Sequence, residues 1–128
     1  MLSQFTPAAT LPTADMSRAR SFYENTLGLA VDREGMDGVS YKSGEGTVLV
    51  YESEYAGTNK ATAVTFEVSL SAFDDEIRTL RDKGVSFLTF ELEGVNWNDG
   101  VASMGDAMKG VWFTDPDGNI ISVAAGEM

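Results

Sequence analysis

The chain has 128 residues, of which 43% are hydrophobic and 23% charged, which is ordinary for one globular domain with a core. A formal net charge of −11 argues against nucleic acid, whose phosphates would be repelled. The charge would favour a cationic ligand, but an acidic surface that only keeps the protein in solution is the commoner explanation. No apolar run approaches the ~20 residues of a membrane span, no secretory signal is visible and there is no cysteine. We therefore expect a cytoplasmic protein that does not contact membranes.

The first half of the chain predicts a strand, a helix and three more strands. Residues 8–13 are compatible with a strand, although Pro12 suits only an edge strand or a strand end. Asp15 offers a helix cap, apolar residues recur at helical spacing as far as Leu27, and Gly28 is expected to end the helix. Further strands are predicted over 29–33, 39–42 and 47–52.

The second half predicts the same order of elements. Residues 63–68 alternate as a strand, with Val64, Phe66 and Val68 on one face and Ala63, Thr65 and Glu67 on the other. Ser71 can cap the next helix, which Gly84 ends. Further strands are predicted over 85–90, 111–114 and 119–124.

The chain is an internal repeat. Gly110–Ser122 aligns with Gly38–Val50 at an offset of 72 without a gap, and both predict a hairpin. The helix-ending glycines Gly28 and Gly84 are only 56 apart, so the second half carries extra residues within 91–109. That segment is predicted to be an inserted loop, acting as a lid or plugging the end of the sheet with Trp97.

Several motifs together resemble the vicinal oxygen chelate superfamily, which includes glyoxalase I, extradiol dioxygenases, fosfomycin-resistance proteins and bleomycin-binding proteins. These motifs are Leu11–Asp15, Ser21–Tyr23, Leu27–Leu29 and Phe113–Asn119. The resemblance implies an α+β fold in which two tandem βαβββ modules form a cleft-shaped half-barrel sheet. A single domain over 1–128 would then contain one module at about 6–53 and another at about 61–125.

The resemblance also implies where a divalent metal would bind. The usual ligand positions fall on Ala8, Val50, Ala63 and Ser122, and the chain contains no histidine. Two alanines and a valine have no donor atom, and a neutral serine hydroxyl is a poor ligand alone. We therefore expect no metal and no cofactor.

Strand alternation from these positions predicts the residues that line the cleft. Ala63 would share its face with Thr65 and Glu67, Val50 with Val48 and Glu52, and Ser122 with Ile120 and Ala124. Trp112 is expected to point inward, whereas Val111 and Phe113 pack behind the sheet. The predicted ligand-binding residues are Val50, Glu52, Ala63, Thr65, Glu67, Trp97, Trp112 and Ser122. Glu67 is also the candidate catalytic base, as a mid-strand carboxylate expected to be buried.

The leading hypothesis is a metal-independent small-molecule-binding protein of the glyoxalase/bleomycin-resistance type, sequestering a drug-like or metabolite ligand that is cationic or aromatic. The resemblance supports this because bleomycin binders are acidic, metal-free and dimeric. Two alternatives stay open: a lyase, isomerase or dioxygenase-type enzyme with a non-standard site, and an accessory domain without a ligand. A twofold homodimer is expected in all three cases.

Overall fold

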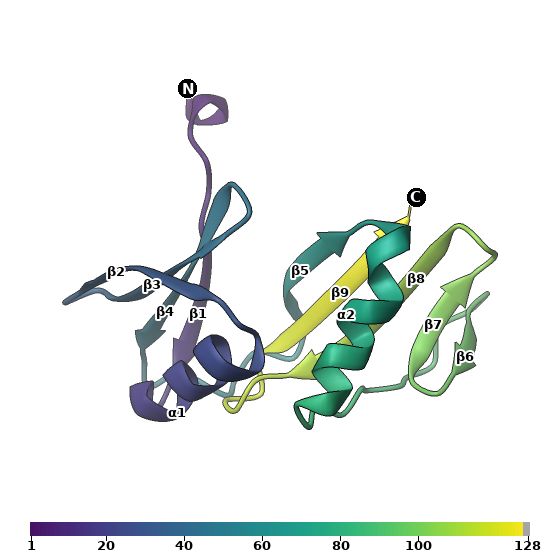
Figure 1. Ribbon diagram of the computed structural model, residues 1–128. Helices are drawn as coiled ribbons and strands as arrows, with labels where there is room; N and C mark the ends of the chain where they lie inside the picture. The colour runs from purple at the N-terminus through teal and green to yellow at the C-terminus, as the bar shows by residue number, and fades with distance from the viewer. Residues whose placement is uncertain (127–128) are drawn as a thin grey trace. The chain divides into compact units, whose positions relative to one another are not determined.

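The computed structural model describes residues 1–126 and has an α+β fold with one four-stranded and one five-stranded sheet (Figure 1). The chain divides into two compact units. The first comprises Met1–Ala63 together with Asp115–Asn119, and the second comprises Val64–Thr114 together with the C-terminal strand. No helix in the described part of the chain is both long and apolar enough to cross a bilayer.

The first unit follows the predicted order of elements. After a short 3-10 turn at Leu2–Gln4, its sheet has the order β1-β4-β3-β2. Its elements are β1 (Ala9–Thr13), α1 (Met16–Arg20), a π-helical turn (Ser21–Thr26), β2 (Ala30–Gly35), β3 (Gly38–Ser43) and β4 (Gly46–Glu52).

Local signals for the ends of these elements are confirmed. The Asp15 carboxylate accepts from the Arg18 backbone N–H at 3.2 Å and caps α1, and Gly28 has the positive φ of 71° typical of a helix-ending glycine. Pro12 lies on β1, at the edge of the sheet. The predicted helix differs in its second half, where the Leu27 N–H bonds to the Phe22 carbonyl five residues back and forms the π-helical turn.

The core of the first unit lies between this helical segment and one face of the sheet. Tyr41 on β3 is fully buried and stacks on Tyr23, with ring centroids 5.9 Å apart. Val39 lies two residues from Tyr41 on the same strand and therefore on the same face. Leu11 and Val50, which are aligned with each other across β1 and β4, complete this face.

The second unit packs one longer helix on its sheet, which has the order β5-β9-β8-β7-β6. Phe73, Ile77 and Leu80 on α2 are buried, and the helix packs on β8 and β9. The helix cap is Ser69 and not the predicted Ser71, because the Ser69 hydroxyl accepts from the Ala72 N–H. The elements are β5 (Thr62–Val68), α2 (Leu70–Asp82), β6 (Asn96–Asn98), β7 (Val101–Met104), β8 (Met108–Thr114) and β9 (Ile120–Gly126).

Two sequence predictions fail between α2 and β8. Residues 85–90 form no strand, although the Leu88 N–H donates one hydrogen bond to the Trp112 carbonyl at 2.7 Å. The strand that pairs with β8 is β7, along Met108 to Gly110. The inserted segment 91–109 is not a plain loop, because it contains the hairpin β6–β7. Its turn residues Asp99 and Gly100 both have positive φ, 52° and 81°, as a two-residue type I′ turn requires.

The gapless alignment of the two hairpins is also wrong, by one residue. Four residues separate the paired Lys42 and Thr47, whereas five separate the paired Thr114 and Ile120. Val50 pairs with Val39 on the face covered by helix, whereas Ser122 pairs with Trp112. Because side chains alternate along a strand, this single extra turn residue changes the face on which the aligned residue lies. Val50 is on the face of its sheet that the helical segment covers, whereas Ser122 is on the face of its sheet opposite α2.

Candidate ligand-binding face

The open face of the second sheet, opposite α2, carries two of the predicted site residues side by side. Val111 and Phe113 are fully buried, so Trp112 between them points to the other face, as predicted. Trp97 pairs with Ala102, which pairs in turn with Gly110, two residues before Trp112. Both tryptophans therefore share this face, although they come from different hairpins.

Phe90 joins the tryptophans to form what we call the aromatic cluster: Phe90, Trp97 and Trp112. The Trp97 and Trp112 ring centroids are 6.1 Å apart, and Phe90 lies 5.4 Å from Trp97 and 5.0 Å from Trp112, nearly edge-on to both. These separations are typical of favourable aromatic pairs. Both tryptophans are half-buried and Phe90 is 44% exposed, so the cluster presents aromatic surface to solvent.

Small side chains surround the aromatic cluster. Gly110, Ala102 and Ala124 are aligned across β8, β7 and β9. A Cβ at Gly110 would lie 3.6 Å from the rim of the Trp112 indole, so that ring rests directly on the backbone. The buried Ser122 lies opposite Trp112 and supplies a hydroxyl on the same face. The Trp112 ring therefore lies against the backbone and small side chains of β7, β8 and β9.

Thr65 and Glu67 lie on β5, the neighbour of β9, and alternation places them on the face away from α2. Both are exposed, whereas Val64, Phe66 and Val68 are half-buried. The prediction that Glu67 is a buried carboxylate is therefore wrong. Its solvated carboxylate supplies negative charge at this face, and no cost of burying a charge arises.

The predicted site residues of the first unit lie elsewhere. Val50 is 1% exposed in the core, on the face that packs on the helical segment, so its predicted position on the ligand side is wrong. Val48 and Glu52 lie two residues to either side of Val50 on β4 and therefore on the same face. Glu52 lines a hollow of ≈480 Å³ with Met16 and Arg20 of α1. Leu49 is the β4 residue on the open face. Ala63 is half-buried at the start of β5.

The divalent metal implied by the resemblance does not fit these residues. Ala8, Val50, Ala63 and Ser122 offer one neutral hydroxyl among them, and replacing Val50 by Leu49 adds no donor. Within residues 1–126, no three Asp or Glu side chains gather closely enough to hold a metal ion.

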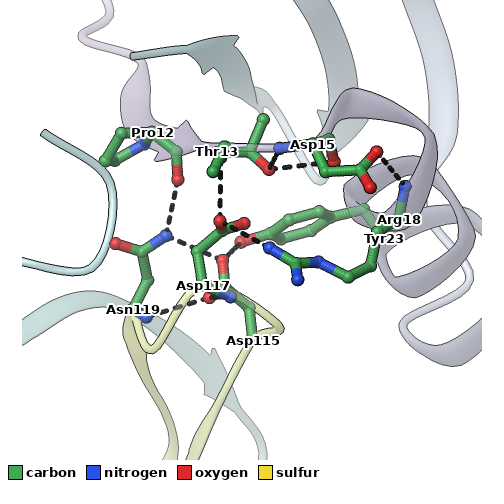
Figure 2. A network of polar contacts seen from close by, with 9 residues as sticks. Pro12, Thr13, Asp15, Arg18, Tyr23, Asp115, Asp117 and Asn119 are labelled. Carbon is green, nitrogen blue, oxygen red and sulfur yellow. Dashed lines mark hydrogen bonds and ion pairs between the residues drawn. The ribbon is translucent and has the colours of Figure 1, made fainter. Parts of the chain in front are cut away.

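A cluster of polar side chains lies at the Asp115–Asn119 turn, which belongs to the first unit (Figure 2). Oδ1 of Asp115 accepts the backbone N–H groups of Asp117 and Asn119, both at 2.9 Å, which closes the turn. Oδ2 accepts from the Tyr23 hydroxyl at 2.5 Å and from the Asn119 amide at 2.8 Å. That amide also donates to the Pro12 carbonyl at 2.9 Å.

Asp117 anchors the same turn to the start of α1. Its Oδ1 accepts from the Ala14 N–H at 2.8 Å and from the Arg18 guanidinium at 2.9 Å, and its side chain is buried (Figure 2). Burial, and next the negative charge of Asp115, raise the pKa of Tyr23 well above its usual range, so this phenol stays protonated. The network is therefore a structural clasp, as expected for turn residues.

The fold and these motifs agree with one superfamily. The Glyoxalase/Bleomycin resistance protein/Dioxygenase superfamily matches residues 6–123, and the chain belongs to it. A search of the curated proteins finds no match.

Three solved structures illustrate the similarity in fold. The fosfomycin resistance protein FosX from Listeria monocytogenes is 13% identical, with a TM-score of 0.73 over 97% of this chain and 94% of its own. A glyoxalase/bleomycin resistance protein/dioxygenase from Alicyclobacillus acidocaldarius is 16% identical, with a TM-score of 0.70 over 97% and 92%. An integron cassette protein from the mobile metagenome of the Halifax Harbour sewage outfall is 17% identical, with a TM-score of 0.68 over 95% and 98%.

Proposed function

We propose that this protein binds a small, planar, cationic organic molecule on the aromatic cluster without the help of a metal ion. The observation that carries the proposal is the gathering of Phe90, Trp97 and Trp112 on the open face of the second sheet. Indole faces attract cations through their quadrupole and stack on flat rings. Aromatic surface with a few polar groups nearby is typical of small-molecule sites.

Charge supports the cationic class of ligand. The chain carries a net charge of −11, and Glu67 contributes an exposed carboxylate to this face of the sheet. A negative field raises the local concentration of cations and speeds their association. Membership of a superfamily named for bleomycin resistance proteins agrees with this class of ligand.

The alternatives from the sequence have less support. A base-catalysed lyase or isomerase would use Glu67, but its side chain is solvated. A ligand-free accessory domain would leave the aromatic surface without a role. The homodimer and the cytoplasmic location stay predictions.

The chain contains two tryptophans, and both belong to the aromatic cluster, so the whole tryptophan emission reports on it. We would titrate protein freed of metals with EDTA against acridine orange, a planar cation, and against an anionic naphthalene sulfonate of similar size. We expect saturable quenching by the cation, with Trp112→Ala weakening its affinity about tenfold, Trp112→Phe less, and the exposed control Tyr55→Ala not at all.

Several outcomes would contradict the proposal. They are no saturable quenching by the cation, equal affinity for the anion, unchanged affinity in Trp112→Ala, or quenching that appears only after a divalent ion is added.

A further inference from the structure

The hairpin β6–β7 is the element that delivers Trp97 to the aromatic cluster. β6 is a three-residue strand at the edge of the sheet, and β7 joins it to β8. The ladder runs from Asn96 opposite Ser103 to Asn98 opposite Val101, with Trp97 in the middle. A strand this short is held weakly, so other contacts of the hairpin help to decide where Trp97 lies.

One such contact comes from α2. Arg81, in the last turn of that helix, places Nη1 3.2 Å from Oδ2 of Asp99 at the hairpin tip, and its Nη2 donates to the Asp99 carbonyl. The same guanidinium lies 5.2 Å from the centroid of the Phe87 ring, a cation–π distance. One side chain therefore contacts a charge, a backbone acceptor and an aromatic ring, a combination that suits arginine and not lysine.

The hairpin tip also contacts Phe87. A Cβ at Gly100 would lie 3.0 Å from Phe87 Cβ, so the tip touches Phe87 closely there. Beside this contact is an open surface hollow of ≈500 Å³, whose lining includes Arg81, Phe87, Asp99 and Gly100. Arg81 and Phe87 therefore both contact the tip from outside its strand ladder.

We propose that Arg81 is a positioning residue that holds the β6–β7 tip and thereby keeps Trp97 against Trp112. Resting on the proposed function, this makes Arg81 a determinant of how open the aromatic cluster is to a ligand. The side chains of Arg81 and Asp99 are 38% and 85% exposed, so the ion pair lies in solvent and is screened by salt. The hold of Arg81 on the tip should therefore weaken as the salt concentration rises.

The test uses the full chain without ligand. Arg81→Gln removes the positive charge and the guanidinium, whereas Arg81→Lys keeps the charge but not the planar guanidinium. Asp99→Asn removes the ion pair with a residue that tolerates the positive φ at this position. The matched control is Arg78→Gln, which loses the same charge one turn earlier on the same helix, where Arg78 pairs only with Asp75 among the described ion pairs.

Two readouts follow the hairpin itself. Hydrogen exchange of residues 96–104 should accelerate about fivefold in Arg81→Gln and less in Arg81→Lys and Asp99→Asn, with helix 70–82 and the Arg78→Gln protein unchanged. The circular-dichroism couplet of two indoles 6.1 Å apart should shrink in the same order, and in the parent protein at high salt.

Equal exchange and an equal couplet in Arg81→Gln and Arg78→Gln would overturn the proposal, as would a uniform acceleration over the whole second unit. Failure of the proposed function is distinguishable, because it appears as absent dye quenching in the parent protein, whatever the hairpin does. If the parent protein binds the dye, a dye affinity in Arg81→Gln equal to that in Arg78→Gln would overturn the role of Arg81 in access.

Discussion

The Tyr23 hydroxyl donates a hydrogen bond to Oδ2 of Asp115 at 2.5 Å, across 92 residues of sequence, and both side chains are buried. Tyr23 lies in the π-helical turn after α1, and Asp115 begins the turn before β9. This contact therefore joins the two halves of the internal repeat within one compact unit.

Removing either partner of this hydrogen bond should destabilise the fold. Asp115 accepts four hydrogen bonds, so Asp115→Asn turns an NH₂ group toward buried donors and should cost about 2–3 kcal/mol; Tyr23→Phe should cost about 1–2 kcal/mol. Urea unfolding measures both, with Tyr55→Phe as an exposed control near zero. The double variant should lose less than the sum; full additivity would mean that the two groups do not interact.

Alkaline pH should destabilise the protein through its two buried tyrosines. The pKa of Tyr23 and that of Tyr41 are both raised above the usual ~10, and burial is the largest cause for each. The next cause is the negative charge of Asp115 for Tyr23 and the hydrogen bond to Glu24 for Tyr41. Above that pH the unfolded chain loses phenolic protons that the folded chain keeps, so stability is complete below pH ~10 and falls as pH rises.

For Tyr23 this decrease is about 1.4 kcal/mol per pH unit. Unfolding free energies measured between neutral and strongly alkaline pH should therefore fall less steeply in Tyr23→Phe and Tyr41→Phe than in the parent protein. Slopes that are the same in all three proteins would show that these phenols are not responsible.

The register of β4 predicts opposite tolerance at two adjacent residues. Val50→Ala leaves a cavity in the core and should cost about 2 kcal/mol, whereas Leu49→Ala, at a half-buried position on the other face, should cost less than about 1 kcal/mol. Urea unfolding of the two single variants is sufficient. A larger loss at Leu49 would instead support the gapless alignment of the hairpins.

Signals carried by neighbouring residues predicted much of this protein. The superfamily motifs, the caps at Asp15 and Gly28, and the edge position of Pro12 each rest on a few adjacent residues and are confirmed. The β6–β7 turn also has a local signal, because Asp99-Gly100 is a strong hairpin dipeptide, although it lies within the segment predicted to be an inserted loop.

The candidate site shows where such signals end. Sequence alternation placed Trp112 opposite Val111 and Phe113, and the burial of those two residues agrees. It did not place Val50, because alternation fixes which residues share a face but not which face that is. Alternation also does not predict the contact of Phe90 with the tryptophans, because Phe90 lies in a stretch without regular secondary structure.

The sequence by itself determined the superfamily, the order of most elements, the mismatch with a metal site and the presence of two tryptophans in the second half. Only the tertiary structure decided the strand register, the clasp between Tyr23 and Asp115, and the meeting of Trp97 with Trp112. The physical reason is that helix ends and turns follow from neighbouring residues. The face that a strand turns inward, by contrast, is set by its cross-strand partner and by the length of the turn that joins them.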